Sequence, residues 1–277
     1  MNIKLGKYNQ LEVVKSVDFG VYLNGGDDGE ILLPTRYVPE NCKPGDVLNV
    51  FIYLDNEERL IATTLQPYVQ VGEFACLEVA WVNEYGAFLD WGLMKDLFVP
   101  FREQKMKMQK GHRYVVHAHL DEDSYRIMAS AKIERYLSKD MPSYQPGEEV
   151  EIMVWQKTDL GYKVIVDNRF GGLVYQREIF QTLEPGMKMQ AFVRQVREDG
   201  KIDLTLQKDG FQKVDDFSSV LLQYIKDQGG HTAFNDKSAA EDIYETFGVS
   251  KKTFKKAVGD LYKKRLILLV EDGIRLT

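Results

Sequence analysis

The sequence predicts a mainly β protein built from three tandem five-stranded barrels, followed by a small α+β domain. Two observations support this prediction. One pattern of short apolar runs and glycine turns occurs three times between residues 6 and 206, and internal repetition of this kind marks tandem domains. After Leu206, the apolar spacing changes from that of strands to that of helices. We therefore expect four units in the 277 residues.

The three copies keep constant offsets of 66 and 75 residues, without internal gaps. These offsets relate Gly20 to Gly86 and Gly161. They also relate the members of three further sets, which are Gly6, Gly72 and Gly147, then Gly45, Gly111 and Gly186, then Ile61, Ile127 and Ile202. We therefore place the barrels at 1–66, 67–140 and 141–212, and the last domain at 213–277.

Each copy reads as five short strands separated by turn residues. In the third copy, these strands are expected at Val150–Trp155, Tyr162–Val166, Leu173–Tyr175, Met189–Val196 and Ile202–Leu206. Five strands in about 65 residues bury a core only if the sheet closes into a barrel, because a flat sheet of this size leaves an apolar face and two edges exposed. Gly20, Gly86 and Gly161 stand where such a barrel needs a bend or a bulge.

The order of motifs resembles a known domain. Phe19-Gly20-Val21-Tyr22, Gly172-Leu173-Val174, Pro185-Gly186 and Lys201-Ile202-Asp203-Leu204 resemble the RNA-binding domain named after ribosomal protein S-one, an OB-fold barrel. This resemblance implies two base-stacking aromatics in each barrel. They map onto Phe19 and Tyr22 in the first copy and onto Tyr85 and Phe88 in the second. The third copy has Leu160 and Lys163 there, and Tyr175 is the candidate replacement.

A second interpretation of these aromatics is that they belong to the core. Phe19 and Tyr22 are three residues apart, so strict strand alternation places them on opposite faces. Both reach one face only if the chain bulges at Gly20.

One arginine recurs after the third strand of each copy. Arg36, Arg102 and Arg177 keep the offsets of 66 and 75 residues. Each is expected either to contact a phosphate or to form a structural pair with a carboxylate. The first copy, with six basic and ten acidic residues, is the weakest electrostatic candidate.

The C-terminal segment predicts three helices and a hairpin. Apolar residues at helical spacing start at Phe217, a second helix is expected after Ser238 as its cap, and a third follows Ser250. Asp272-Gly273 suits the turn of a closing hairpin. Three helices closed by a two-stranded hairpin form a winged helix.

The third of these helices is strongly basic, with seven basic residues and one acid between Ser250 and Arg265. It stands where a recognition helix would lie. We therefore take Lys251, Lys252, Lys255 and Lys256 as candidate nucleic-acid contacts. The alternatives are a solvated lysine face and a protein-interaction module.

Composition excludes several functional classes. The net charge of -6 argues against nucleic-acid binding by overall charge, so such contacts must be local. No apolar run reaches the length of a membrane span, and two cysteines favour a reducing compartment, so we expect a cytoplasmic protein. Nucleotide-binding, hydrolase and metalloprotease motifs do not occur. We expect neither an enzyme nor a cofactor or metal.

Three such barrels followed by a winged helix resemble the conserved virulence factor B family of bacterial RNA-binding proteins over essentially the whole chain. The resemblance implies a non-enzymatic protein that binds single-stranded RNA and influences gene expression after transcription. Two other classes remain open. The winged helix could dock a protein partner, or it could bind duplex DNA as a dimer, although nothing marks a dimerisation helix.

Overall fold

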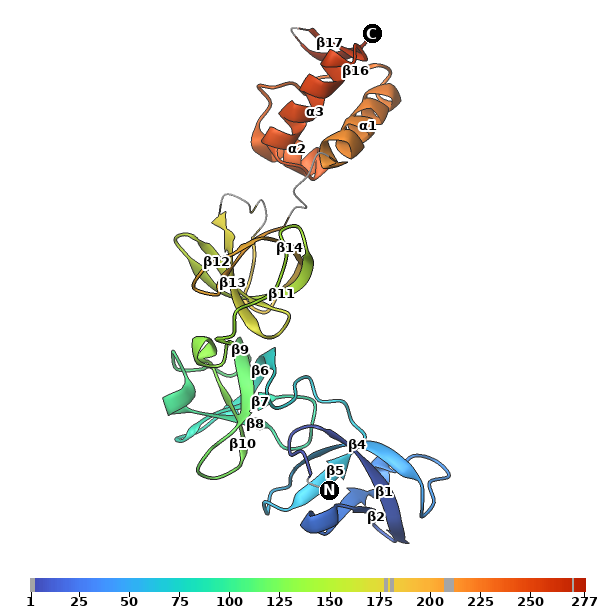
Figure 1. The fold of residues 1–277 in the computed structure, drawn as a ribbon, viewed down its shortest axis with the longest axis vertical. Coiled ribbons are helices and arrows are strands. Elements are labelled where there is room, and N and C mark those ends of the chain that lie inside the picture. Colours follow the sequence, from blue (N-terminus) through green and yellow to red (C-terminus); the bar gives the residue numbers. More distant parts are fainter. Residues whose placement is uncertain (1–2, 177–178, 180–181, 207–211, 271) are drawn as a thin grey trace.

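The computed structural model describes residues 3–176, 179, 182–206, 212–270 and 272–277. Three closed barrels follow one another along the chain, and a helical domain with a small sheet lies at the C-terminal end (Figure 1). The predicted fold class is therefore confirmed. No helix within the described ranges is long and apolar enough to cross a membrane.

The barrels share one topology. The first contains β1 (Tyr8–Val17), β2 (Gly20–Asn24), β3 (Glu30–Pro34), β4 (Val47–Leu54) and β5 (Leu60–Thr63). The second contains β6 (Phe74–Val82), β7 (Gly86–Asp90), β8 (Leu97–Pro100), β9 (Arg113–Leu120) and β10 (Ile127–Ser130). The third contains β11 (Glu149–Thr158), β12 (Gly161–Val166), β13 (Phe170–Tyr175), β14 (Lys188–Val196) and β15 (Ile202–Thr205). In each barrel the third strand pairs in parallel with the fifth, which closes the sheet.

Short 3-10 helices lie in the segments that connect or follow the barrel strands. Two of them directly follow the third strands, at Thr35–Tyr37 (η2) and Phe101–Glu103 (η3), and they carry Arg36 and Arg102. Two more lie within the described ranges, which are η1 (Gly26–Asp28) and η4 (Ile133–Arg135).

The bulge of each barrel lies in the first strand. The register shifts at Val14 in β1, at Ala80 in β6 and at Trp155 in β11, which are again 66 and 75 residues apart. Of the bend or bulge expected at Gly20, the bulge therefore lies in the neighbouring strand and not at Gly20 itself. Gly20 is instead required because its φ is +154° and because a Cβ atom there would overlap the carbonyl oxygen of Leu33 on the neighbouring strand.

Apolar contacts join the barrels to one another. Phe51 of β4 packs edge-on against Trp91 of the second barrel, with ring centroids 5.7 Å apart, inside one continuous core cluster. A second cluster joins barrels two and three and contains Phe74, Val115, Ile133, Met153, Trp155 and Ile165. Both junctions therefore bury large apolar side chains, which stabilises the contact between neighbouring barrels.

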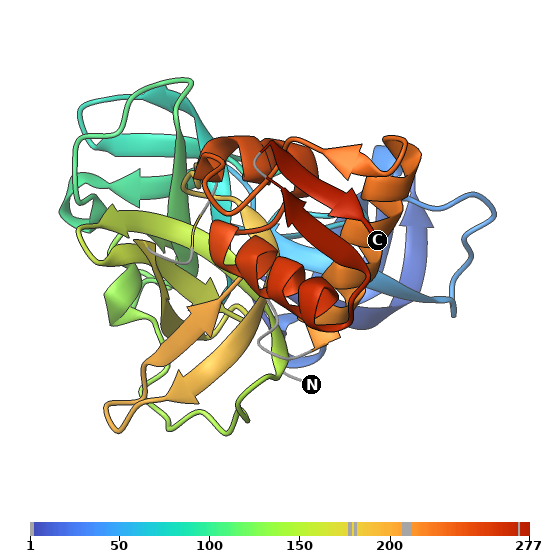
Figure 2. The ribbon, with the colours of Figure 1, turned by 90° about the horizontal axis from the view of Figure 1, so that it is seen from above.

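The C-terminal domain is a winged helix. It contains α1 (Gln212–Asp227), β16 (His231–Thr232), α2 (Ala240–Phe247), α3 (Lys251–Lys263), β17 (Ile267–Val270) and β18 (Gly273–Leu276). The three strands form one sheet in the order β16-β18-β17, which packs against α1 and α3 (Figure 2). The predicted hairpin is confirmed, whereas β16 was not predicted because two residues carry no periodic signal.

Local capping differs from the prediction at one helix. Ser238 does not cap α2, because its Oγ accepts a hydrogen bond from the backbone N–H of Asn235 at 3.0 Å. Ser250 does cap α3, since its Oγ accepts from the backbone N–H of Thr253 at 3.1 Å.

Candidate nucleic-acid interface

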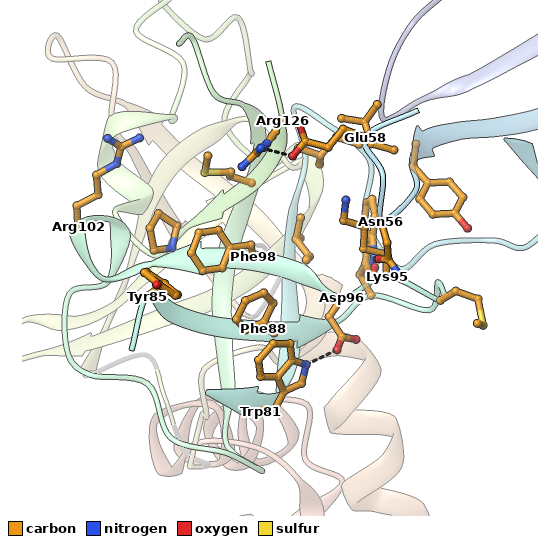
Figure 3. A pocket seen from close by; sticks show the side chains of 18 residues that line it. Asn56, Glu58, Trp81, Tyr85, Phe88, Lys95, Asp96, Phe98, Arg102 and Arg126 are labelled. Carbon is orange, nitrogen blue, oxygen red and sulfur yellow. Dashed lines mark hydrogen bonds and ion pairs between the residues drawn. The ribbon is translucent and has the colours of Figure 1, made fainter. Parts of the chain in front are cut away.

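An aromatic ladder crosses the face of the second barrel. Trp81 of β6 pairs in register with Phe88 of β7, and Phe88 pairs with Phe98 of β8. The rings of Trp81 and Phe88 are parallel within 2°, with centroids 3.7 Å apart, and Phe98 follows at 4.9 Å (Figure 3). Three rings from three adjacent strands therefore form one row.

The bulge at Ala80 and a turn before β7 produce this row. The bulge shifts the register of β6 by one residue, which brings Trp81 onto the side of the sheet that carries Phe88. Tyr85 lies in the turn, where Asn83 Oδ1 accepts hydrogen bonds from the backbone N–H groups of Tyr85 and Gly86. Tyr85 is 66% exposed and Trp81 42%, while Phe88 is only partly exposed between its two neighbours.

The ladder lines a pocket of about 800 Å³ that two barrels share. One side is the face of the second barrel, including Tyr85 and the ladder. The other side is the β4–β5 hairpin of the first barrel, with Asn56 and Glu58 near its tip (Figure 3). A flat base and its sugar fit a volume of this size, which is typical of small-molecule sites.

Three cations line the pocket, and each has a protein partner. Arg102 donates to Asp121 at 2.8 Å, yet its side chain is 62% exposed. Arg126 forms an ion pair with Glu58 across the barrel junction. Lys95 Nζ donates to the backbone carbonyl of Asp55 at 2.7 Å, and burial lowers the pKa of this lysine. Of the two predicted roles for Arg102, the structure shows the ion pair, and its exposure leaves room for a further contact.

The first barrel has a weaker version of this face. Phe19 lies in the β1–β2 turn, and its ring meets that of Tyr22 edge-on at 6.3 Å. Phe19 is 57% exposed, so the pair is not core. Lys15, which pairs with Tyr22 as Trp81 does with Phe88, lies over the Tyr22 ring at 4.8 Å. Arg36 is exposed and lies 4.8 Å over the ring of Tyr37.

The third barrel replaces the ladder with polar and aliphatic side chains. Gln156, Lys163 and Leu173 are the paired residues there, and a pocket of about 630 Å³ lies over this face. Tyr175 is engaged in the protein, because its hydroxyl accepts a hydrogen bond from Arg197 at 2.7 Å. Arg177 lies outside the described residues.

The lysines of α3 divide into two groups. Lys252, Lys255 and Lys256 are exposed. Lys251 is only partly exposed, and its Nζ donates to the carbonyl of Ser238 at 2.6 Å. The structure thus leaves three of the four predicted lysines open to solvent. Over the described part of the chain, no group of three or more potential metal ligands occurs.

Sequence comparison of the repeats did not reveal Trp81 and Phe98. Their counterparts at the constant offset are Lys15 and Leu32, so nothing in the repeat marked them as aromatic positions. Strand pairing identifies them, because both stand opposite Phe88.

Comparisons with known proteins support nucleic-acid binding. Residues 5–65 match the S1 domain family, and residues 219–276 match the CvfB-like winged helix domain. The S1 match covers the first barrel, and S1 domains are nucleic-acid-binding modules, so it supports binding of nucleic acid by this chain.

Relatives match this chain over nearly its full length. YitL of Bacillus subtilis is 30% identical over 272 residues, which cover 95% of this chain and 90% of that protein. Conserved virulence factor B of Staphylococcus aureus is 24% identical over 99% of this chain and 94% of its own length. A crystal structure of a multidomain protein with nucleic acid binding domains from Streptococcus pneumoniae is 25% identical, with a TM-score of 0.44 and coverage of 99% of this chain and 98% of that chain. The chain belongs to the conserved virulence factor B family.

Proposed function

We propose that this protein binds single-stranded RNA without catalysing a reaction, and that it regulates gene expression after transcription. The observation that carries this proposal is the row of Trp81, Phe88 and Phe98 in a pocket of about 800 Å³. Unpaired bases stack on aromatic rings, whereas the bases of a duplex are already stacked on each other. RNA is proposed over DNA because of the resemblance to an RNA-binding barrel.

The second barrel is the principal base-binding unit in this proposal. In the pocket, the exposed aromatic surface belongs to Trp81 and Tyr85, and one face of Phe88 is already covered by Trp81. Each stacked base contributes about 1–3 kcal/mol. Phe19 and Tyr22 of the first barrel add a second, smaller stacking surface, because Lys15 covers the Tyr22 ring.

Phosphates are bound by cations around these surfaces. Arg102 lies at the rim of the pocket with its side chain 62% exposed. Arg36 occupies the equivalent 3-10 helix of the first barrel. The exposed lysines of α3 supply a third set at the far end of the molecule (Figure 1). Binding is therefore expected to weaken as salt rises, with a slope of about 0.7 per neutralised phosphate.

The test is fluorescence anisotropy of a labelled single-stranded RNA with full-length protein. Trp81→Ala and the double variant Tyr85→Ala/Phe88→Ala are each expected to weaken binding by about 5- to 150-fold, the range that corresponds to one lost stacking contact. Tyr68→Ala is the matched control, since Tyr68 is 65% exposed but lies outside the lining of the pocket. Unchanged affinity of both pocket variants would refute the proposal.

The wing hairpin favours a second candidate function, which is the docking of a protein partner. Tyr262, Leu268 and Leu269 are between 48% and 56% exposed on the last helix and strand β17. Docking on this surface would depend on apolar contact and would be nearly independent of salt. Two results together would favour this alternative. The full-length protein would fail to bind any RNA, and it would capture a protein partner independently of salt, whereas the variant Leu268→Ser/Leu269→Ser would not.

A further inference from the structure

A carboxylate in the pocket points to recognition of a base edge. Glu58 is neutralised by its ion pair with Arg126. Asp96 is different, because its only hydrogen-bond partner among the described residues is the neutral indole of Trp81. A carboxylate repels phosphate groups. In a pocket that binds RNA, Asp96 is therefore expected to contact a base and not the phosphate backbone.

The geometry holds Asp96 at the edge of the stacked rings. The indole Nε1–H of Trp81 donates to Asp96 Oδ2 at 2.8 Å. An indole N–H lies in the plane of its ring, so the carboxylate lies beside the rings and not above them (Figure 3). A base that stacks on the exposed face of Trp81 would present its edge to Asp96. In the described part of the chain, Oδ1 of Asp96 has no hydrogen bond, so it is open to a donor.

Hydrogen-bond donors stand next to this acceptor. Lys95 precedes Asp96, and Asn56 of the β4–β5 hairpin of the first barrel lines the same pocket (Figure 3). The Lys95 ammonium uses one N–H for the carbonyl of Asp55 and has two more. The edge of the pocket thus offers donors on one side and a carboxylate acceptor on the other.

This pattern complements guanine. The Watson–Crick edge of guanine places the O6 acceptor beside two donors, N1–H and the N2 amino group. Uracil has one donor between two acceptors, so its O2 would face the carboxylate unfavourably. Adenine and cytosine place a ring-nitrogen acceptor beside their amino group. Resting on the proposed function, we propose that Asp96, with Lys95 and Asn56, makes this pocket selective for guanine in single-stranded RNA.

The experiment compares 12-nucleotide oligouridines that differ at one central position, which is guanosine, inosine, adenosine, cytidine or uridine. Fluorescence anisotropy with the full-length protein is expected to show binding about tenfold tighter for guanosine than for uridine, because a bidentate base contact discriminates by about that factor or more. Inosine lacks the N2 amino group and is expected to lose most of this gain. Replacement of guanosine by 7-deazaguanosine is expected to change nothing, since the Watson–Crick edge is intact.

Two variants separate base recognition from support of the ring. Asp96→Asn keeps an acceptor for the Trp81 indole but loses the second acceptor, so it is expected to abolish the guanosine preference while uridine binding persists. Glu58→Gln, which removes a different carboxylate from the same pocket, is expected to keep the preference. Binding without any preference for guanosine, or a preference that survives Asp96→Asn, would overturn this inference and leave the proposed function standing. Absence of binding to all five oligonucleotides would overturn both.

Discussion

A buried histidine at the junction of barrels two and three makes the fold sensitive to acid. His117 of β9 is 7% exposed, and its ring stacks on Tyr136 at 4.2 Å and contacts Phe74 at 4.6 Å. Its Nδ1 has no hydrogen-bond partner among the described residues. Burial, and to a smaller extent the neighbouring His119, lower the pKa of His117 to about 4. At neutral pH the folded protein therefore holds this ring uncharged.

The size of the effect follows from proton linkage. The ordinary pKa of histidine is 6.5, so the unfolded chain takes up a proton at this site at higher pH than the folded chain does. Stability is complete above about pH 7 and falls as the pH drops from 6.5 towards 4. At pH 5 the loss is about 2 kcal/mol, and below pH 4 it reaches about 3 kcal/mol.

The assay is urea unfolding at pH 7.5 and pH 5.0, monitored by tryptophan fluorescence, because Trp91 and Trp155 are buried at the two barrel junctions. His117→Phe keeps a ring of similar shape and cannot be protonated. The free energy of unfolding of the variant is expected to fall less than that of the natural protein between the two pH values, by about 2 kcal/mol. An equal fall in both proteins, or an NMR titration of the His117 ring with a midpoint near 6.5, would refute the reasoning.

Two further perturbations test the fold. Gly161→Ala is expected to lower the unfolding temperature by an amount that corresponds to about 1–3 kcal/mol, because φ is +146° and the new Cβ would overlap the carbonyl oxygen of Val174. Gly147→Ala is the control, since Gly147 also has a positive φ but has open space around it. An equal loss of stability in both variants would contradict the role of the overlap. Phe51→Ala is expected to lower the free energy of unfolding by about 3–5 kcal/mol and to weaken the contact between barrels one and two, since this fully buried ring contacts Trp91. Small-angle X-ray scattering is expected to show a larger radius of gyration for the variant. An unchanged scattering profile would contradict the role of Phe51 in holding the two barrels together.

Repetition made the fold and part of the site predictable from the sequence. The resemblance to an S-one-type domain indicates Tyr85 and Phe88, at the same offset as Phe19 and Tyr22, and the structure places both in the lining of the pocket. Trp81 and Phe98 could not be predicted in this way, because the aromatic ladder depends on which residues of neighbouring strands pair with each other. That register depends on a bulge at Ala80, and alanine, unlike glycine, gives no signal of a bulge.

Side-chain contacts between residues far apart in the sequence were also beyond sequence reasoning. Arg102 could be assigned to a phosphate or to a carboxylate, and only the fold brings Asp121, 19 residues away, to its side. The approach of Glu58 to Arg126 joins two different barrels. No periodicity records such a contact, because it depends on how two separately folded units pack together.

The barrel junction connects the stability of this protein to its proposed activity. The first barrel carries six basic and ten acidic residues, which makes it a poor phosphate binder by itself. Its β4–β5 hairpin nevertheless forms one side of the pocket on the second barrel. The apolar contact between Phe51 and Trp91 fixes this hairpin. A site divided between two domains keeps its shape only while the junction is intact, so the buried junction is itself part of the proposed recognition of RNA.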